Sequence, residues 1–289
     1  MSKLLAAPVP VFKLYGETGA WPTPDLIHCE SIPERSKLHG WEIKPHRHSD
    51  LVQLLYVQAG QATLKVEDEV NLVDSPSLQV VPALSVHTFK FSADTQGHVL
   101  SLALPLAHQL GALLGSPVLT TAVCYPVGAE RAYLDTLFSA LAQEYSQQRS
   151  GRDAMLQSLI TILSIWLSRR KQALSSSDTL QVDRGRDYLQ VFIKTLELRF
   201  REHLPIDHYA ATLGISTAHL NALCRRLAGQ SALQMINQRL LLEAKRDLVY
   251  TSMTIAEVSD NLGFSDPAYF SRFFKRCTGQ SPKQFRVQR

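Results

Sequence analysis

Three histidines and a few neighbouring polar and aromatic residues have the side chains of a small binding site. His46 and His48 stand one residue apart, and His87 follows Pro82 in a later segment. Imidazole nitrogens hydrogen-bond to polar ligands, pair with carboxylates and bind metal ions, and aromatic rings stack on an aromatic ligand. We therefore expect a pocket for a small organic anion, such as an aromatic acid, lined by His46, His48, Gln53, Tyr56, His87 and Phe89.

The back half holds a second set of candidate residues, in a pattern that occurs twice. One copy begins at Ile206 and the other at Ile255, and each contains a Leu-Gly pair (Leu213-Gly214 and Leu262-Gly263) followed by a basic segment. A short helix, a tight glycine turn and a second, basic helix form a helix-turn-helix unit that reads the DNA major groove. We expect the two units at about 206–227 and 255–277.

The helical period divides each second helix into two faces. The inner faces are expected to hold Leu220, Leu223, Cys224 and Leu227 in the first unit, and Phe270, Phe273, Phe274 and Cys277 in the second. Outward amide and guanidinium groups near the helix start suit base edges, and later basic pairs suit phosphates. The DNA-contacting residues are expected to be Ala218, Asn221, Ala222, Arg225, Arg226, Ala268, Ser271, Arg272, Lys275 and Arg276.

A long helix is expected between the two units. Residues 231–251 place Leu233, Ile236, Leu240, Ala244 and Leu248 on one side. At 1.5 Å per residue this helix is ~30 Å long, close to the ~34 Å of one DNA turn, so it can set both reading helices into adjacent major grooves. A helical bundle whose repeat reflects packing alone is the alternative, but it does not explain the matched outward basic residues.

Charge is distributed unevenly along the chain. Residues 180–289 carry 16 Lys and Arg against 10 Asp and Glu, whereas residues 1–179 carry 14 against 16. A basic back half indicates a polyanionic partner, and double-stranded DNA fits the repeated motif. An ordinary solvated basic face is the alternative that charge alone leaves open.

Cysteine spacing and hydropathy indicate the cellular environment. The widely spaced cysteines (Cys29, Cys124, Cys224 and Cys277) predict reduced, mostly buried thiols in a cytoplasmic protein. The N-terminal apolar run is too short for a signal peptide, and no run reaches the roughly 18 apolar residues of a membrane span.

The pattern of apolar residues predicts an α+β chain. Short runs at 51–57, 61–66, 78–81 and 98–104 predict strands of a small β-barrel or double sheet. Helical spacing at 133–145 and 156–167 then predicts two amphipathic helices, which either cap the barrel or form a dimer seam. The expected divisions are a ligand-binding barrel at 1–125 (its first forty residues an arm with a strand or two), a helical capping or dimerisation segment at 126–173, a linker at 174–182 and a DNA-binding domain at 183–289.

The back half resembles the DNA-binding domain of AraC/XylS-type transcription regulators. The resemblance rests on Arg239, Ala244, Leu248, the segments 254–264 and 266–275, and Gly279, Pro282 and Phe285. It implies base-reading positions at Ala218, Asn221 and Ala222 in the first unit and at Ala268 and Arg272 in the second. Ala218 and Ala222 depart from the longer side chains that are frequent there, which indicates that the first unit reads shape or thymine methyl groups.

The front half resembles a cupin. Gly40, His46, His48, Gln53 and Gly60 fit the first cupin motif, with Gln53 where metal cupins carry Glu, and 82–87 resembles the second motif without its glycines. In metal cupins such histidines converge inside the barrel, so a divalent metal on His46, His48 and His87 remains an alternative to a metal-free pocket. We expect no required metal or cofactor. Segments 45–48, 53–56 and 81–87 resemble a PobR-like subgroup that responds to 4-hydroxybenzoate or related aromatic acids.

These features together predict a ligand-responsive transcription regulator. The expected protein is a homodimeric, non-enzymatic activator of a catabolic operon that binds promoter DNA, a small-molecule effector and RNA polymerase. Two other functions remain open. A cupin oxygenase or isomerase fused to a DNA-binding module would need a metal, and the amide of Gln53 argues against it. An architectural DNA-binding protein would need no effector.

Overall fold

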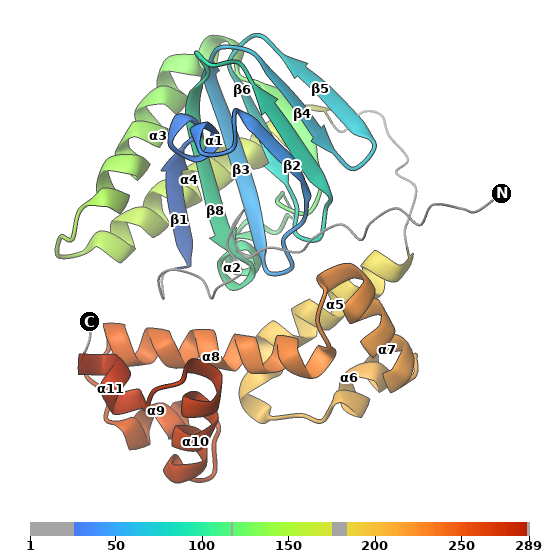
Figure 1. Ribbon diagram of the computed structural model, residues 1–289, viewed down its shortest axis with the longest axis vertical. Helices are drawn as coiled ribbons and strands as arrows, with labels where there is room; N and C mark the ends of the chain where they lie inside the picture. Colours follow the sequence, from blue (N-terminus) through green and yellow to red (C-terminus); the bar gives the residue numbers. More distant parts are fainter. Residues whose placement is uncertain (1–25, 117, 175–183, 288–289) are drawn as a thin grey trace. The chain divides into compact units, whose positions relative to one another are not determined.

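The computed structural model describes residues 26–116, 118–174 and 184–287. These residues divide between two compact units, one within 26–174 and one within 184–287, and Figure 1 shows a unit of sheets and helices and a unit of helices alone. Residues 1–25 of the predicted forty-residue arm and all but the first residue of the predicted linker at 174–182 lie outside the described residues. The rest of the predicted arm holds one strand, at Ile27–Ser31.

Two antiparallel sheets form the centre of the first unit. A five-stranded sheet has the order β1-β8-β3-β6-β9, and a four-stranded sheet has the order β2-β7-β4-β5 (Figure 1). The strands are β1 Ile27–Ser31, β2 Glu42–His46, β3 Leu51–Ala59, β4 Ala62–Val66, β5 Glu69–Val73, β6 Ser77–Val81, β7 His87–Phe91, β8 Gln96–Ala103 and β9 Val123–Pro126. The predicted strands correspond to β3, β4, β6 and β8, and the expected double sheet is confirmed.

The core of this unit comes from alternate residues of facing strands, because successive side chains of a strand point to opposite sides of its sheet. Leu55 and Val57 of β3 pack with Leu64 of β4 and with Phe89 and Phe91 of β7 in one buried cluster. Burial of a residue of this size stabilises the fold by about 1.5–3 kcal/mol. The alternation also decides which side of β3 each of its other residues faces.

Four helices accompany the sheets: α1 Ile32–Lys37, α2 Leu104–Leu114, α3 Arg131–Ser146 and α4 Arg152–Leu174, with the short 3-10 turn η1 Gly128–Glu130. Phe138 of α3 stacks on Tyr56 of β3 at 4.7 Å between ring centroids. Trp166 of α4 makes an edge contact with Tyr125 of β9. The two predicted helices, now α3 and α4, therefore cover the outer face of the five-stranded sheet, and α1 and α2 are additional.

The second unit is a chain of short helices around one long helix. Its elements are α5 Arg184–Arg199, η2 Phe200–Glu202, α6 Ile206–Thr212, α7 Thr217–Leu223, η3 Cys224–Ala228, α8 Ala232–Tyr250, α9 Ile255–Asn261, α10 Pro267–Thr278 and α11 Pro282–Val287. Helix α8 starts with a capping box, in which Ser231 and Gln234 each bond the other's backbone N–H. Its 19 residues span about 28 Å at the α-helical rise.

An arginine joins α8 to α5 at the centre of this unit. Arg239 of α8 donates to Glu197 of α5 at 2.7 Å and to Glu243 at 2.9 Å, and its guanidinium lies over the Phe200 ring. The Arg239 side chain is 10% exposed, so both carboxylates are needed to compensate its lost hydration. Ala244 is completely buried on the same helix.

The environment of the thiols differs from the prediction at one end of the chain. Cys29 and Cys224 are buried and Cys124 is half-buried, but Cys277 is exposed. Burial raises the pKa of the Cys29 and Cys224 thiols to about 12. Within the described residues, no helix is both long enough and apolar enough to cross a membrane.

Candidate functional site

The first reading helix, α7, is capped by Ser216, whose hydroxyl accepts a hydrogen bond from the His219 N–H at 3.1 Å. Such a cap stabilises a helix by about 1 kcal/mol. Four of the predicted DNA-contacting side chains are exposed: Ala218, Ala222, Arg225 and Arg226. The two arginines stand on a π-helical turn, η3, which follows α7 and ends at Gly229.

Asn221 does not point outward as predicted. Its side-chain N–H₂ donates to the Thr217 carbonyl at 3.2 Å, and its side-chain oxygen accepts from the Ala232 N–H at 3.2 Å. Ala232 is the first residue of α8, so Asn221 ties the reading helix to the start of the long helix. The half-buried amide is thus bonded to the protein's own backbone, which the helical period alone could not reveal.

The second reading helix, α10, presents a larger set of polar side chains. Its cap is Asp266, which accepts from the N–H groups of Ala268 and Tyr269. Arg272 is 69% exposed and lies 3.9 Å from Asp266. Ala268, Lys275 and Arg276 are also exposed, and Ser271 is half-buried.

Burial confirms the predicted inner faces, with one exception. Leu220, Leu223, Cys224, Leu227, Phe270, Phe273 and Phe274 are buried. Cys277 was expected to pack inward but is exposed. Leu227 stands at the equivalent place in the first unit, where the π-helical turn rotates it inward. Regular winding of α10 as far as Thr278 leaves Cys277 at the surface.

Two exposed side chains on the reading helices were missed. His219 and Tyr269 both stand three residues after the helix cap, and Tyr269 is 49% exposed. The Arg272 guanidinium lies 5.9 Å from the Tyr269 ring centroid. Counting each unit from its cap would have identified the pair from sequence.

The turns before the two reading helices have different surroundings. Gly214 and Gly263 both have positive φ, at 66° and 76°. A Cβ at Gly214 would meet nothing within 4 Å, whereas a Cβ at Gly263 would collide with the Arg201 carbonyl. His203 also bonds the Leu262 carbonyl at 2.9 Å. The second turn is therefore packed against the segment that follows α5, and the first is open.

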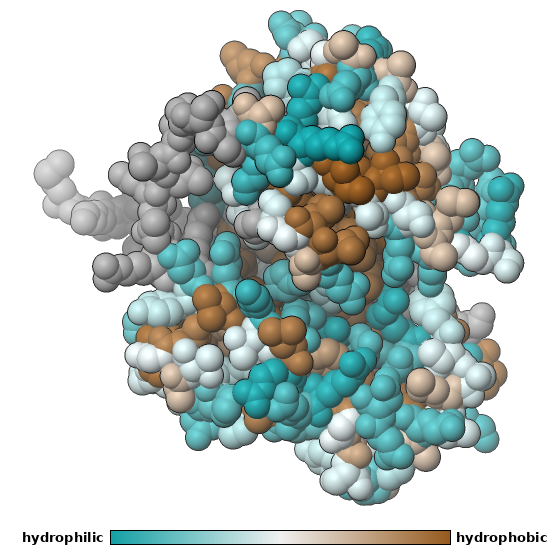
Figure 2. Space-filling model, turned by 180° about the vertical axis from the view of Figure 1, so that it is seen from behind, coloured by the Kyte–Doolittle hydropathy of each residue, from teal (hydrophilic) through white to brown (hydrophobic). Residues whose placement is uncertain are grey.

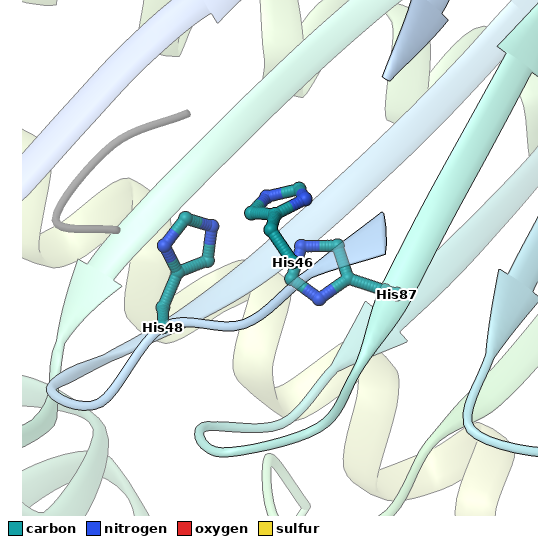
Figure 3. A group of neighbouring side chains, drawn as sticks. All are labelled: His46, His48 and His87. Atoms are coloured by element: carbon teal, nitrogen blue, oxygen red, sulfur yellow. The ribbon is translucent and has the colours of Figure 1, made fainter. Parts of the chain in front are cut away.

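In the unit of sheets and helices within residues 26–174, the three histidines converge as predicted. His46 ends β2, His48 lies just after it, and His87 begins β7, as Figure 3 shows. His46 and His87 are cross-strand partners, and their ring centroids are 4.1 Å apart. His48 lies 4.8 Å from His46 and 5.1 Å from His87. All three are almost completely buried.

Hydrogen bonds fix the protonation pattern of two of these rings. Nδ1 of His46 donates to the Lys44 carbonyl and Nδ1 of His87 donates to the Ser85 carbonyl, each at 2.9 Å. In a neutral ring, Nε2 then carries the lone pair. Burial lowers the pKa of His46 to about 4 and the pKa of His87 well below its ordinary value. Both imidazoles are therefore neutral at neutral pH.

The donor set of the cluster fits a transition metal. One nitrogen from each ring lies within 4.8 Å of the others, and neutral imidazoles suit zinc and related ions. Nε2 of His87 is buried without a hydrogen-bond partner among the described residues. Orphaned buried polar atoms are rare in folded proteins, and a metal or a polar ligand would satisfy this one.

The other predicted pocket residues divide between the two sides of the sheet. Gln53 is buried and donates to Ser101 at 3.1 Å, and the Phe89 ring lies 5.2 Å from His87. The prediction that Tyr56 lines the same pocket is wrong, because its hydroxyl donates to Asp135 of α3 at 2.7 Å. Strand alternation places Tyr56 opposite to Leu55 and Val57, which face the core.

Comparison with protein families gives two matches. A model described as an AraC-like ligand binding domain matches residues 28–163, which include the histidine cluster. A model described as a helix-turn-helix domain matches residues 209–288, which include both glycine turns and both reading helices.

Individual proteins are similar over part of the chain. The arabinose operon regulatory protein of Salmonella typhimurium is 34% identical over 163 residues, which are 56% of each chain. The protein of the same name from Escherichia coli is 33% identical over 56% of this chain and 54% of its own. The matched region thus spans little more than half the length of these relatives.

Solved structures resemble the chain more distantly. A crystal structure of an apo ToxT variant from Vibrio cholerae covers 92% of this chain and 98% of its own at 10% identity, with a TM-score of 0.42. A likeness at this level carries no argument about function.

Proposed function

We propose that this chain is a ligand-responsive, sequence-specific transcription regulator of the AraC type that binds promoter DNA, because its two parts match an AraC-like ligand binding domain and a helix-turn-helix domain. The observation that carries the proposal is the exposure of basic side chains on both reading helices of one helical unit. Arg225 and Arg226 lie on the turn that continues the first helix, and Arg272, Lys275 and Arg276 lie on the second helix.

In the proposed complex α7 and α10 enter successive major grooves. Their units lie at the two ends of α8, as Figure 1 shows, and this helix is a stiff spacer of nearly one DNA turn in length. Ala218, Ala222, Ala268 and Arg272 face base edges, while Arg225, Arg226, Lys275 and Arg276 neutralise phosphates. Ser271 and Asn221 are half-buried and lie beside the residues that make these contacts.

Selection from random duplex DNA by the purified full chain tests this function. We expect an enriched site with two parts whose centres lie about 10–10.5 base pairs apart. The double variant Arg272→Ala/Lys275→Ala is the control, because both positions are exposed and leave the fold intact. No enrichment by the wild-type chain, or equal enrichment by the variant, would contradict the proposal.

We further propose that the unit of sheets and helices within residues 26–174 binds an aromatic carboxylic acid next to the histidine cluster. His46, His48 and His87 offer polar nitrogens, Gln53 offers an amide, and Phe89 offers an apolar wall. The PobR-like segments indicate 4-hydroxybenzoate as the first compound to try. The relatives are named for an arabinose operon, so L-arabinose is the competing candidate.

Thermal-shift measurements distinguish the two ligand classes. Binding to the folded state raises the melting temperature by an amount that grows with the ratio of ligand concentration to dissociation constant. We expect a shift with 4-hydroxybenzoate that His46→Ala abolishes, and no shift with benzenesulfonamide as a neutral aromatic control. A shift with L-arabinose alone would replace the aromatic acid by a sugar.

Self-association is proposed through α3 and α4. Tyr133, Met155 and Ile162 are large apolar side chains left 40–52% exposed, and Figure 2 shows hydrophobic residues at the surface of this unit. A groove of about 700 Å³ is lined by Glu130, Tyr133, Ile162, Ile165, Trp166, Arg169 and Arg170. A homodimer would cover this surface.

Sedimentation measurements with Ile162→Glu test the dimer. The charge should shift the protein to a monomer, whereas Leu72→Glu, on exposed β5, should leave it dimeric. A dimer unaffected by either change would place the seam elsewhere. Reporter transcription with and without effector then decides whether the protein is the proposed activator of a catabolic operon that contacts RNA polymerase.

A further inference from the structure

We infer that His46, His48 and His87 form a three-histidine site for a divalent transition metal, with zinc the best fit. The inference rests on side-chain placement in the unit of sheets and helices within residues 26–174. It does not depend on DNA binding or on the identity of the effector, so either of those proposals can fail without it.

The backbone brings the three rings together. His46 and His87 are opposite each other in the β2–β7 pair, after a shift of register between Ile43 and His46. The Leu84 N–H donates to the His48 carbonyl at 2.7 Å, which holds the loop after β2 against the loop before β7. Two backbone constraints, the strand pairing and the loop hydrogen bond, therefore bring the three residues together, and neither is a contact between the rings.

The hydrogen-bond pattern around the rings matches that of metal ligands. Histidine ligands almost always donate their second ring N–H to a carbonyl or carboxylate, which fixes the tautomer and the ring direction. His46 and His87 do so through Nδ1 to Lys44 and Ser85. Each then presents Nε2, and for His87 this atom is buried with no partner among the described residues.

Distance and donor type select the class of metal. Zinc binds imidazole nitrogen at about 2.0–2.1 Å in a tetrahedron, which places ligand nitrogens about 3.4 Å apart. The nitrogens here lie within 4.8 Å of one another, so small ring rotations close the site. Three neutral nitrogens with no carboxylate suit zinc better than magnesium or calcium, which prefer oxygen.

An alternative without metal would leave the rings to bond one another. Two neutral rings can share one N–H, but Nδ1–H of His46 and of His87 is already donated to backbone. A neutral imidazole carries one N–H in all, so neither of these rings then donates through Nε2, and a neutral His48 likewise has a single N–H to give. Bonds among neutral rings therefore supply an N–H to at most one of the two Nε2 atoms, and for Nε2 of His87 no partner is found among the described residues.

The first test uses full-length protein from which any affinity tag and bound metal have been removed. Titration with Co²⁺ should give about one ion per chain and the visible absorption of a low-coordinate Co²⁺–imidazole site, and Zn²⁺ should displace it. His48→Gln and His87→Gln should each weaken binding by more than the about 10–100-fold cost of losing an outer-shell partner. His98→Gln, a half-buried histidine outside the cluster, should bind like wild type.

A second measurement does not depend on any variant folding. X-ray absorption of the zinc-loaded wild-type chain should show imidazole nitrogens at about 2.0–2.1 Å and no sulfur at about 2.3 Å. Sulfur ligation would move the metal to a cysteine and overturn the inference. Failure of the wild-type chain to bind Co²⁺ or Zn²⁺, or binding that survives in both glutamine variants, would overturn it as well.

Discussion

The two helix-turn-helix units share a frame but present different reading surfaces. Counted from the caps Ser216 and Asp266, both helices reach a glycine in left-handed conformation after the same number of residues, at Gly229 and Gly279. In this alignment Ala222 of the first helix corresponds to Arg272 of the second. The second copy has one residue more than the first between its glycine and its cap, with Gly263 to Asp266 against Gly214 to Ser216, and this residue precedes the reading helix.

This difference indicates that the two helix-turn-helix units have different roles in DNA recognition. The first exposes methyl groups and commits Asn221 to the start of α8. The second exposes the guanidinium of Arg272, which can form two hydrogen bonds with guanine. We expect the first unit to contribute shape readout and phosphate contacts, and the second to contribute most of the direct discrimination between bases.

The largest expected effect concerns stability of the turns. Gly214→Ala should cost about 1–2 kcal/mol, the cost of left-handed backbone for a residue with a Cβ. Gly263→Ala should cost about 3 kcal/mol or more, because the new methyl group also collides with the Arg201 carbonyl. Urea unfolding of the helical unit, followed in the full chain, measures both. Equal costs would mean that the second turn is not packed as described.

Arg272→Ala should produce the largest loss of sequence discrimination. We expect about 1–3 kcal/mol at one base pair, since the bidentate contact is removed. Asn221→Ala should lose less, because its amide is already bonded inside the protein. Footprints of both variants on a selected site and on point-mutated sites compare them. A greater loss in Asn221→Ala would reverse the proposed roles of the units.

Asn221→Ala should instead lower stability by about 1 kcal/mol, as the loss of a capping side chain does. Its counterpart Ser271 bonds nothing equivalent in the described structure, so Ser271→Ala should change stability by less than about 0.5 kcal/mol. Thermal unfolding of the two variants gives the comparison. A neutral Asn221→Ala would show that the tie to Ala232 contributes nothing.

The smallest effects are expected at the phosphate-contacting residues. Lys275→Ala and Arg225→Ala should each weaken binding to all sequences alike and reduce the slope of log affinity against log salt by about 1. Equal changes would show that both basic pairs reach the backbone of DNA. A change in the second unit alone would mean that the π-helical turn directs Arg225 away from it.

Periodic features of the chain were predictable from sequence. Short apolar runs predicted the strands β3, β4, β6 and β8, and the helical period predicted α3, α4, α8 and the buried faces of the reading helices. The repeated glycine turns located both units. These signals are local, and packing reinforces them rather than overriding them.

Features decided by one hydrogen bond or one register shift were not predictable. The side chain of Asn221 turns inward because the start of α8 lies beside it, and Tyr56 faces α3 because of its parity on β3. Parity could have been counted once Leu55 and Val57 were assigned to the core. The position of Cys277 depends on regular winding in α10, against a π-helical turn at the same place in the first unit.

That π-helical turn limits how freely the two units can be exchanged. Each residue within it advances less along the axis and rotates less around it than in an α-helix. A graft of the base-facing side chains of α10 onto α7 would thus transfer their chemistry to the first helix. Arg225 and Arg226 would still point in the directions that the π-helical turn gives them. Engineered specificity in the first half-site requires redesign of residues 224–228 together with the helix before them.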